Sequence, residues 1–167
     1  MTEGAMDASA MDGGCSCGAV RYRVTGEPIF VNECHCTLCQ RQTGAAAAVN
    51  LFIESDRVER LSGQLVETCE ATGSGAEQIL CRCDRCLGLV WSHYGGLGRG
   101  CTAVRVGTLD APGAVRPDAA IYTRSRLPWL ASSPGIPDYE THYRPSELLA
   151  PARFARLKAA IAKKAEA

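Results

Sequence analysis

Long apolar runs are missing from this sequence of 167 residues. No stretch approaches the roughly 20 apolar residues that cross a bilayer, so we expect no membrane partner. A dominant charge sign is missing too, because 18 Lys and Arg balance 18 Asp and Glu. This balance argues against a protein that binds nucleic acid. Residues 1–14 lack both a basic and an apolar region, so we expect no signal peptide and a cytoplasmic protein.

Cysteine, in contrast, is abundant, with ten residues. In a reducing cytoplasm such residues are usually kept as thiols, and clustered cysteine pairs are more often metal ligands than disulfides. Apolar residues make up 46% of the chain and charged residues 22%, which fits one globular domain with an ordinary core. The sequence is compatible with a homo-oligomer and does not decide for or against one.

Short stretches of alternating apolar and polar residues predict a mainly β fold. In residues 19–24, Val20, Tyr22 and Val24 share one face and the arginines between them share the other. Further strands are predicted at residues 29–33, 46–53, 64–69, 77–80, 89–94, 102–108 and 119–123. Turns rich in glycine and aspartate separate them, a pattern typical of an antiparallel β domain.

We expect three parts along the chain. Residues 1–13 are small, acidic and rich in Gly and Ala, which predicts a flexible leader. Residues 14–145 hold the cysteine clusters and would form a zinc-binding domain, with four prolines making its last part irregular from Leu127 onward. Residues 146–167 would form a C-terminal helix. Pro151 suits its first turn, and its Lys and Arg side chains are expected to face solvent.

Two cysteine pairs from distant parts of the chain predict a closed metal site, the four-cysteine cluster. Cys83 and Cys86 have the Cys-x-x-Cys spacing that places two sulfurs on one ion, and Cys15 and Cys17 can join them where the backbone bends. Four sulfurs suit a structural zinc ion, so we assign this cluster no chemistry. Cys81 could replace Cys83, because the pair Cys81 and Cys83 has the same spacing as the N-terminal pair.

Cys34, Cys36 and Cys39 place three sulfurs within six residues and form the three-cysteine cluster. Three protein ligands plus one open position is the pattern of a catalytic zinc ion, and an exogenous thiol entering that position would bind as the nucleophilic thiolate. Three thiolates already donate much charge, so the site suits holding a thiolate better than ionising water. His35 should point away from its neighbours in extended backbone and is not expected to be a ligand.

Other interpretations stay open. Cys69 or Cys101 could close the three-cysteine cluster, which would make both metals structural. Iron–sulfur ligation is an alternative to zinc, although the spacing favours zinc. A closed cluster beside a basic or aromatic patch would indicate a zinc-stabilised binding or carrier module without catalysis. The balanced charge and the aromatic content of only 6% argue against that module.

Several segments together resemble the glutathione-dependent formaldehyde-activating enzyme family. The resemblance rests on Gly14–Tyr22, Cys34–Gly44, Cys83–Cys86, Gly107–Asp110, Ile121–Tyr122 and Ser125–Trp129. It extends from about Gly13 to Trp129, and the combined spacing is far more specific than any single cysteine pair. The sequence departs from the family pattern at Gln40, Arg82, Leu87 and Ala120.

The resemblance implies a β-tent fold of antiparallel strands with two zinc ions per chain. It implies a structural ion on Cys15, Cys17, Cys83 and Cys86, and a second ion on Cys34, Cys36 and Cys39 that is open to a thiol. The implied activity is the condensation of glutathione with formaldehyde to S-hydroxymethylglutathione, which would make the chain a carbon–sulfur lyase. Centromere-associated relatives in the same family act as binding proteins.

Bound glutathione, or a related thiol, needs cations for its carboxylates, and arginine pairs with carboxylate through two hydrogen bonds. Arg41 is the first candidate, followed by Arg21, Arg124 and Arg126. We therefore expect an enzyme whose catalytic residues are the three-cysteine cluster, acting on the adduct of a small thiol with an aldehyde or another electrophile. The alternative is the binding or carrier module without catalysis.

Overall fold

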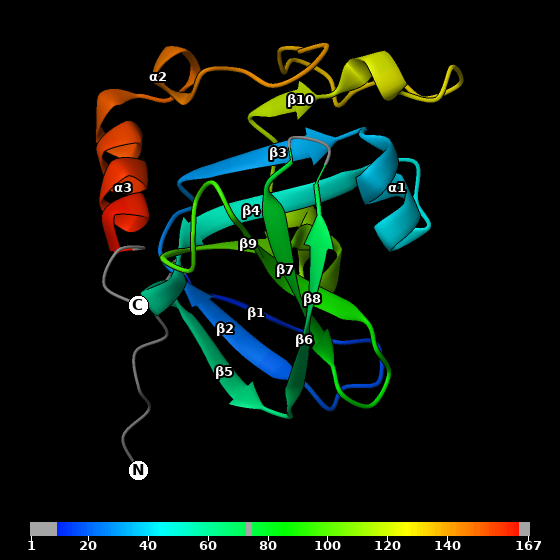
Figure 1. The fold of residues 1–167 in the computed structure, drawn as a ribbon, viewed down its shortest axis with the longest axis vertical. Coiled ribbons are helices and arrows are strands. Elements are labelled where there is room, and N and C mark those ends of the chain that lie inside the picture. Colours follow the sequence, from blue (N-terminus) through cyan, green and yellow to red (C-terminus); the bar gives the residue numbers. More distant parts are fainter. Residues whose placement is uncertain (1–9, 73–74, 164–167) are drawn as a thin grey trace.

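The computed structural model describes residues 10–72 and 75–163, which form two β-sheets with few helices (Figure 1). The strands are β1 (Ala10–Gly14), β2 (Arg21–Thr25), β3 (Phe30–Cys34), β4 (Ala48–Glu54), β5 (Val58–Ser62), β6 (Leu65–Ala71), β7 (Glu77–Cys83), β8 (Leu89–Tyr94), β9 (Cys101–Arg105) and β10 (Ala119–Ile121). The α-helices are α1 (Thr37–Thr43), α2 (Pro145–Leu148) and α3 (Pro151–Ala162). The mainly β fold with a C-terminal helix is confirmed.

The strands divide into a small sheet and a large sheet. The small sheet has the order β1-β2-β5, and the large sheet has the order β10-β3-β4-β9-β8-β7-β6. Described strand pairs are antiparallel except β10 with β3, so the expectation of antiparallel strands alone is wrong at this edge. A long connection separates these two strands in the chain, and such a connection permits the parallel direction that a short hairpin turn forbids.

One core lies between the two sheets. Tyr22 and Val24 of β2 are fully buried, as the alternation predicts, and pack with Leu51 and Trp91 of the large sheet. The Tyr22 ring meets the Trp91 ring edge-on, with centroids 5.6 Å apart and planes at 87°. The small sheet therefore covers one face of the large sheet.

A second core lies on the opposite face of the large sheet. Successive side chains of a strand point to opposite faces, so β3 and β4 turn Val31 and Leu51 toward the first core and Phe30 and Phe52 away from it. The two phenylalanine rings stack with centroids 4.2 Å apart. They pack against Leu157 of α3, so the C-terminal helix covers this second face (Figure 1).

Helix α3 begins at Pro151, as expected, but two of its basic residues form ion pairs with acidic residues of the rest of the fold. Arg153 donates two hydrogen bonds to Asp118, at 2.9 and 2.6 Å. Arg156 donates two to Glu54, each at 2.7 Å. The expectation of a solvated basic face is wrong for these two residues, which tie the helix to the large sheet.

Strand β1 corrects the expected leader. Residues 10–14 pair with β2, and Arg23 donates to both carboxylate oxygens of Asp12, at 2.7 and 2.8 Å. The flexible leader predicted at residues 1–13 is therefore wrong from Ala10 onward, and residues 1–9 lie outside the described residues. Strand β5 was not predicted either, because Val58 is half-buried and its other residues are exposed, so no alternation of burial marks it.

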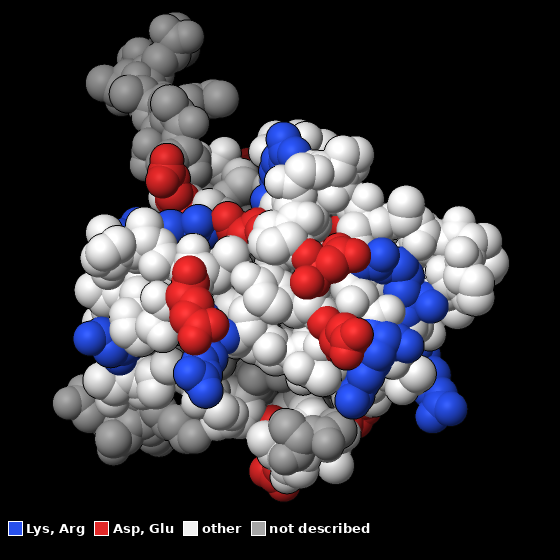
Figure 2. Space-filling view, turned by 90° about the horizontal axis from the view of Figure 1, so that it is seen from above, with Lys and Arg blue, Asp and Glu red and all other residues white. Residues whose placement is uncertain are grey.

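The described surface shows no concentration of one charge sign on the face seen in Figure 2, where basic and acidic side chains are interspersed. Among the helices that the structure describes, none has the length and apolar composition required to cross a membrane.

Candidate functional site

The four-cysteine cluster connects the two sheets. Cys15 and Cys17 lie in the turn between β1 and β2, Cys83 ends β7, and Cys86 lies in the next turn. The four sulfurs lie within 4.8 Å of one another, with Cys15 and Cys17 3.5 Å apart and Cys17 and Cys83 3.8 Å apart. Sulfurs bound about 2.3 Å from a tetrahedral zinc ion are about 3.8 Å apart, so this cluster could hold one ion.

Hydrogen-bond donors point at these sulfurs. The backbone N–H of Val20 donates to Cys15 Sγ at 3.3 Å, and that of Arg85 donates to Cys83 Sγ at 3.4 Å. Bonds from the Gly88 backbone and the Ser16 hydroxyl lower the pKa of Cys86 to about 6. These donors stabilise thiolates, the form that binds metal. The turn also forces Leu87, at φ 57°, into the left-handed region that suits glycine.

The three-cysteine cluster forms where β3 meets α1. Cys34 ends β3, Cys36 is the N-cap of α1, and Cys39 lies in its first turn. Their sulfurs lie within 4.8 Å of one another. Contacts with Cys34 and Cys39 lower the pKa of Cys36 to about 2, and contacts with Cys36 and Cys39 raise the pKa of Cys34. The cluster therefore forms one thiolate readily, and a bound cation would favour ionisation of all three.

The other cysteines left open by the sequence belong to neither metal-ligand group among the described residues. Cys69 is exposed. Cys81 is buried, and its sulfur lies 3.8 Å from a Glu67 carboxylate oxygen. Cys101 packs in the core beneath α3. Burial raises the pKa of Cys81 and of Cys101 to about 12, as expected for thiols that pack without a metal.

His35 is not part of the three-cysteine cluster, in agreement with its predicted orientation. Its side chain is fully buried, with Nε2 3.1 Å from Glu33 Oε1. The other oxygen of Glu33 accepts a hydrogen bond of 2.6 Å from the Ser133 hydroxyl. These contacts fix β3 to the irregular segment that precedes α2.

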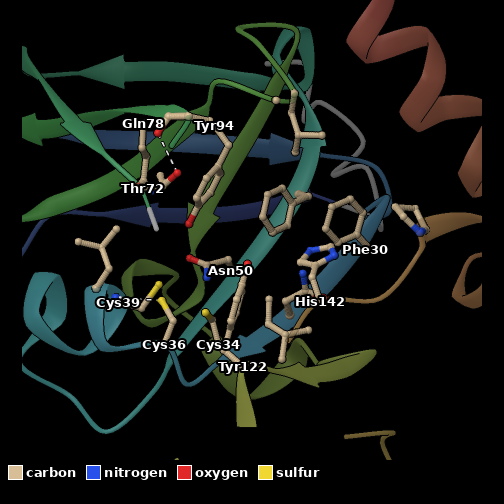
Figure 3. A pocket seen from close by; sticks show the side chains of 18 of the residues that line it. Phe30, Cys34, Cys36, Cys39, Asn50, Thr72, Gln78, Tyr94, Tyr122 and His142 are labelled. Atoms are coloured by element: carbon tan, nitrogen blue, oxygen red, sulfur yellow. Dashed lines mark hydrogen bonds between the residues drawn. The ribbon is translucent and has the colours of Figure 1, made fainter. Parts of the chain in front are cut away.

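The three-cysteine cluster forms one end of a cavity of about 560 Å³. Figure 3 shows the three cysteines gathered at one end, Phe30 and His142 at the other, and Asn50 between them. The four-cysteine cluster contributes nothing to the cavity lining. No further His, Cys, Asp or Glu among the described residues joins the three-cysteine cluster, and all three cysteines line the cavity.

Comparison with known proteins agrees with this geometry. A family model described as glutathione-dependent formaldehyde-activating enzyme matches residues 10–125. This chain belongs to that family. The match covers both cysteine clusters and all ten strands, so the resemblance of the sequence motifs is confirmed.

Individual relatives are more distant. A protein of Halomonas elongata, provisionally named a glutathione-dependent formaldehyde-activating enzyme, is 32% identical over 88 residues. This match covers 48% of the chain and 54% of that relative, so the chain spans about half of the relative's length. A crystal structure of a Rhodobacter sphaeroides protein is 24% identical, and its overlap covers 64% of this chain and 92% of that one with a TM-score of 0.45.

Two tyrosines line the cavity of this family member beside the cysteines. Burial raises the pKa of Tyr94 and of Tyr122, and the neighbouring cysteines raise both further. Both hydroxyls therefore keep their protons and can donate hydrogen bonds. Tyr122 has φ 55° and ψ 38°, a left-handed conformation that costs a residue with a side chain about 1–2 kcal/mol. Tyr94 lies in no sequence motif, so its place at the cavity becomes visible only in the fold.

The arginine candidates separate clearly. Arg21 pairs with Asp110, and Arg126 pairs with Asp138 at 2.5 Å. Arg41 is exposed on α1 and does not line the cavity. Arg124 lines the cavity and has no carboxylate partner among the described residues. Of the four, Arg124 is the one placed to meet a cavity ligand.

A buried network of hydrogen bonds holds helix α1, which carries Cys39 of the three-cysteine cluster, against the large sheet. Arg105 is 5% exposed and donates to Asn50 Oδ1 at 2.5 Å and to Gln42 Oε1 at 3.0 Å. Gln42 on α1 in turn donates to Gln78 Oε1 at 3.1 Å. Gln40, a departure from the family pattern, donates to two backbone carbonyls and so anchors α1. Long-range pairing creates this network, so the sequence motifs gave no signal for Arg105.

Proposed function

We propose that this chain is a zinc-dependent enzyme that forms and cleaves the carbon–sulfur bond of a small-thiol adduct. The first reaction to consider is the addition of glutathione to formaldehyde, which gives S-hydroxymethylglutathione. The reverse reaction cleaves a carbon–sulfur bond, so the enzyme would be a carbon–sulfur lyase. The family membership and the name of the Halomonas relative support this choice. The observation that carries the proposal is the three-cysteine cluster with its open side at the end of a cavity.

The donor sets of both clusters suit zinc, because thiolates select soft or borderline ions and tetrahedral four-sulfur sites are typical of zinc. Cys15, Cys17, Cys83 and Cys86 would hold a structural ion, and Cys34, Cys36 and Cys39 would hold the second. When bound there, zinc supplies the positive charge that keeps an incoming thiol ionised. A reducing cytoplasm is the location we propose, since it keeps such cysteines available as ligands.

The side chains of the cavity would act on the other reactant. As the sulfur–carbon bond forms, the carbonyl double bond opens, and the proton lost from the thiol is balanced by one gained at oxygen. The protonated hydroxyls of Tyr94 and Tyr122 can donate hydrogen bonds to that oxygen as its charge develops. Arg124 is better placed than Arg41 to bind a carboxylate of glutathione, because only Arg124 lines the cavity.

Exchange NMR of glutathione with formaldehyde tests the proposal, because the uncatalysed reaction already interconverts the species. We expect zinc-loaded protein in catalytic amounts to raise the exchange rate, and Cys36→Ser to abolish the increase. Cys69→Ser is the matched control, since this exposed cysteine belongs to neither cluster. Adduct binding without a rate increase would identify the carrier alternative, and neither binding nor acceleration would reject this pair of reactants.

A further inference from the structure

The cavity has three layers along one face of two strands. Side chains two residues apart share a face, so β3 presents Cys34, Asn32 and Phe30 in succession. Asn50 and Phe52 of β4 pair with Asn32 and Phe30 and repeat the order. At about 3.3 Å per residue, the aromatic layer lies about 13 Å along β3 from the sulfur layer. A one-carbon aldehyde attached to sulfur would not reach it.

The middle layer holds an unused hydrogen-bond donor. Asn32 is 1% exposed, and its Oδ1 accepts a hydrogen bond of 2.8 Å from the Tyr143 hydroxyl. Its Nδ2 is buried without a hydrogen-bond partner among the described residues, and Asn32 lines the cavity. Buried donors are nearly always satisfied in folded proteins, so an orphaned amide at a cavity wall indicates a ligand with an acceptor oxygen at this level.

The far layer is apolar. Phe30 and Phe52 are 4% and 6% exposed and stack against each other, and Leu97 and Leu157 line the same end of the cavity. Of the charged lining residues, Glu77 and Arg124 are exposed and lie at the rim. His142 lies beside Phe30 at this end, and its Nδ1 lies 2.7 Å from the Tyr143 backbone oxygen. No described Asp, Glu, Lys or Arg lines the cavity beside the aromatic layer, so an apolar guest is the one this end would stabilise best.

We propose that the cavity accepts thiol adducts of aldehydes that carry an apolar chain or ring. The proposal rests on the proposed function, because it places the adduct sulfur at the three-cysteine cluster. The aldehyde-derived oxygen then accepts the hydrogen bond of Asn32 Nδ2, and the apolar substituent lies in the end of the cavity that the aromatic layer, Leu97 and Leu157 line. In the reaction, the thiol sulfur bonds to the aldehyde carbon as the carbonyl π bond opens, the thiol loses its proton, and the former carbonyl oxygen gains one and becomes a hydroxyl.

Stable thioethers provide a binding test that does not depend on turnover. S-methyl-, S-propyl- and S-hexylglutathione would be titrated calorimetrically into the zinc-loaded protein. Each buried methylene tightens Kd by about fourfold at most, so we expect S-hexylglutathione to bind at least about tenfold more tightly than S-methylglutathione. A Kd that stays constant along the series, or no binding of any member, would overturn the proposal.

A pair of leucine variants localises the effect. Leu97→Ala removes part of the apolar lining, and Leu61→Ala truncates a leucine that is 46% exposed and outside the cavity. We expect the ratio of the S-methyl to the S-hexyl Kd to fall by about threefold or more in Leu97→Ala and to stay unchanged in Leu61→Ala. Equal ratios in both variants would contradict the placement of the substituent.

The exchange experiment separates this proposal from the function on which it rests. If the protein catalyses glutathione–formaldehyde exchange but the Kd does not depend on chain length, the proposed enzyme is supported and the site for an apolar substituent is rejected. A Kd that depends on chain length would support the binding site. If the protein then accelerated the exchange of glutathione with neither formaldehyde nor hexanal, the proposed enzyme would be rejected.

Discussion

Loss of one ligand from the four-cysteine cluster should both release a metal ion and unfold the protein more easily. The test is Cys83→Ser, with Cys81→Ser as its control. The two cysteines lie on the same strand, β7, and are 0% and 2% exposed, so the substitution places a hydroxyl in an equally buried position. Only Cys83 has its sulfur in the cluster.

The expected magnitude follows from the chain that the metal closes. Cys17 and Cys83 are 66 residues apart in sequence, and their sulfurs are 3.8 Å apart. The loop-closure relation used for disulfides gives about 4 kcal/mol for a link of this length, and a metal link restricts the unfolded chain in the same way. For a protein of this size, that loss lowers Tm by about 8–16 °C.

Metal analysis and thermal unfolding give the two readouts. Wild type and Cys81→Ser should carry two equivalents of zinc per chain, and Cys83→Ser should carry one and melt at the lower temperature. Two equivalents in Cys83→Ser with an unchanged Tm would refute the ligand assignment. Loss of an ion in Cys81→Ser instead would show that Cys81 is the ligand.

Three further predictions concern single side chains. Arg124→Gln should raise KM for glutathione about five- to tenfold with little change in kcat, whereas Arg41→Gln should leave both unchanged in steady-state kinetics. Leu87→Gly should raise the free energy of unfolding in urea by about 0.5–1 kcal/mol, because glycine relieves the positive φ; a decrease would contradict that strain. Burial raises the pKa of Glu54, but the hydrogen bonds and charge of Arg156 outweigh burial, so the pKa is lowered on balance. The pair therefore stabilises the fold fully above about pH 4.5. Glu54→Gln should therefore cost about 1 kcal/mol at pH 7, and the cost should shrink as the pH falls below 4.5 and through the lowered pKa of the folded state, as measured by urea unfolding at a series of pH values.

Local patterns predicted strand β2 because it has one buried and one more exposed face. Val20, Tyr22 and Val24 alternate with arginines and are all fully buried. Strand β8 begins and ends where the pattern predicted, at Leu89 and Tyr94. Strand β1 escaped prediction because Met11 is its one large apolar residue, and pairing with β2 holds it in place.

Cysteine spacing predicted both metal-ligand groups, since a tight turn places neighbouring sulfurs on the same side. The Cys-x-x-Cys spacing favoured Cys83 and left Cys81 as an alternative, because both lie on the same face of β7 and the choice depends on how far along the strand the turn of Cys15 and Cys17 meets it. In the structure this turn meets the end of β7, and Cys83 joins the cluster. The cavity escaped prediction for a related reason, because Phe30, Asn32 and Cys34 become one surface only when α3 and the segment before α2 enclose them.

The buried charge of Arg105 distinguishes the surroundings of the three-cysteine cluster from those of the four-cysteine cluster. Among the described residues Arg105 has no carboxylate partner, and its two hydrogen-bond partners, Asn50 and Gln42, are neutral. A buried cation without a counter-charge costs several kcal/mol. Three thiolates around one divalent ion carry a net charge of about −1, by the protonation states that metal binding requires. Glu70 accepts a hydrogen bond of 3.0 Å from Gln42 and is one anion of this network. The ionised cluster would be a second anion that balances Arg105, and one further thiolate entering from the cavity would be drawn by the same positive charge.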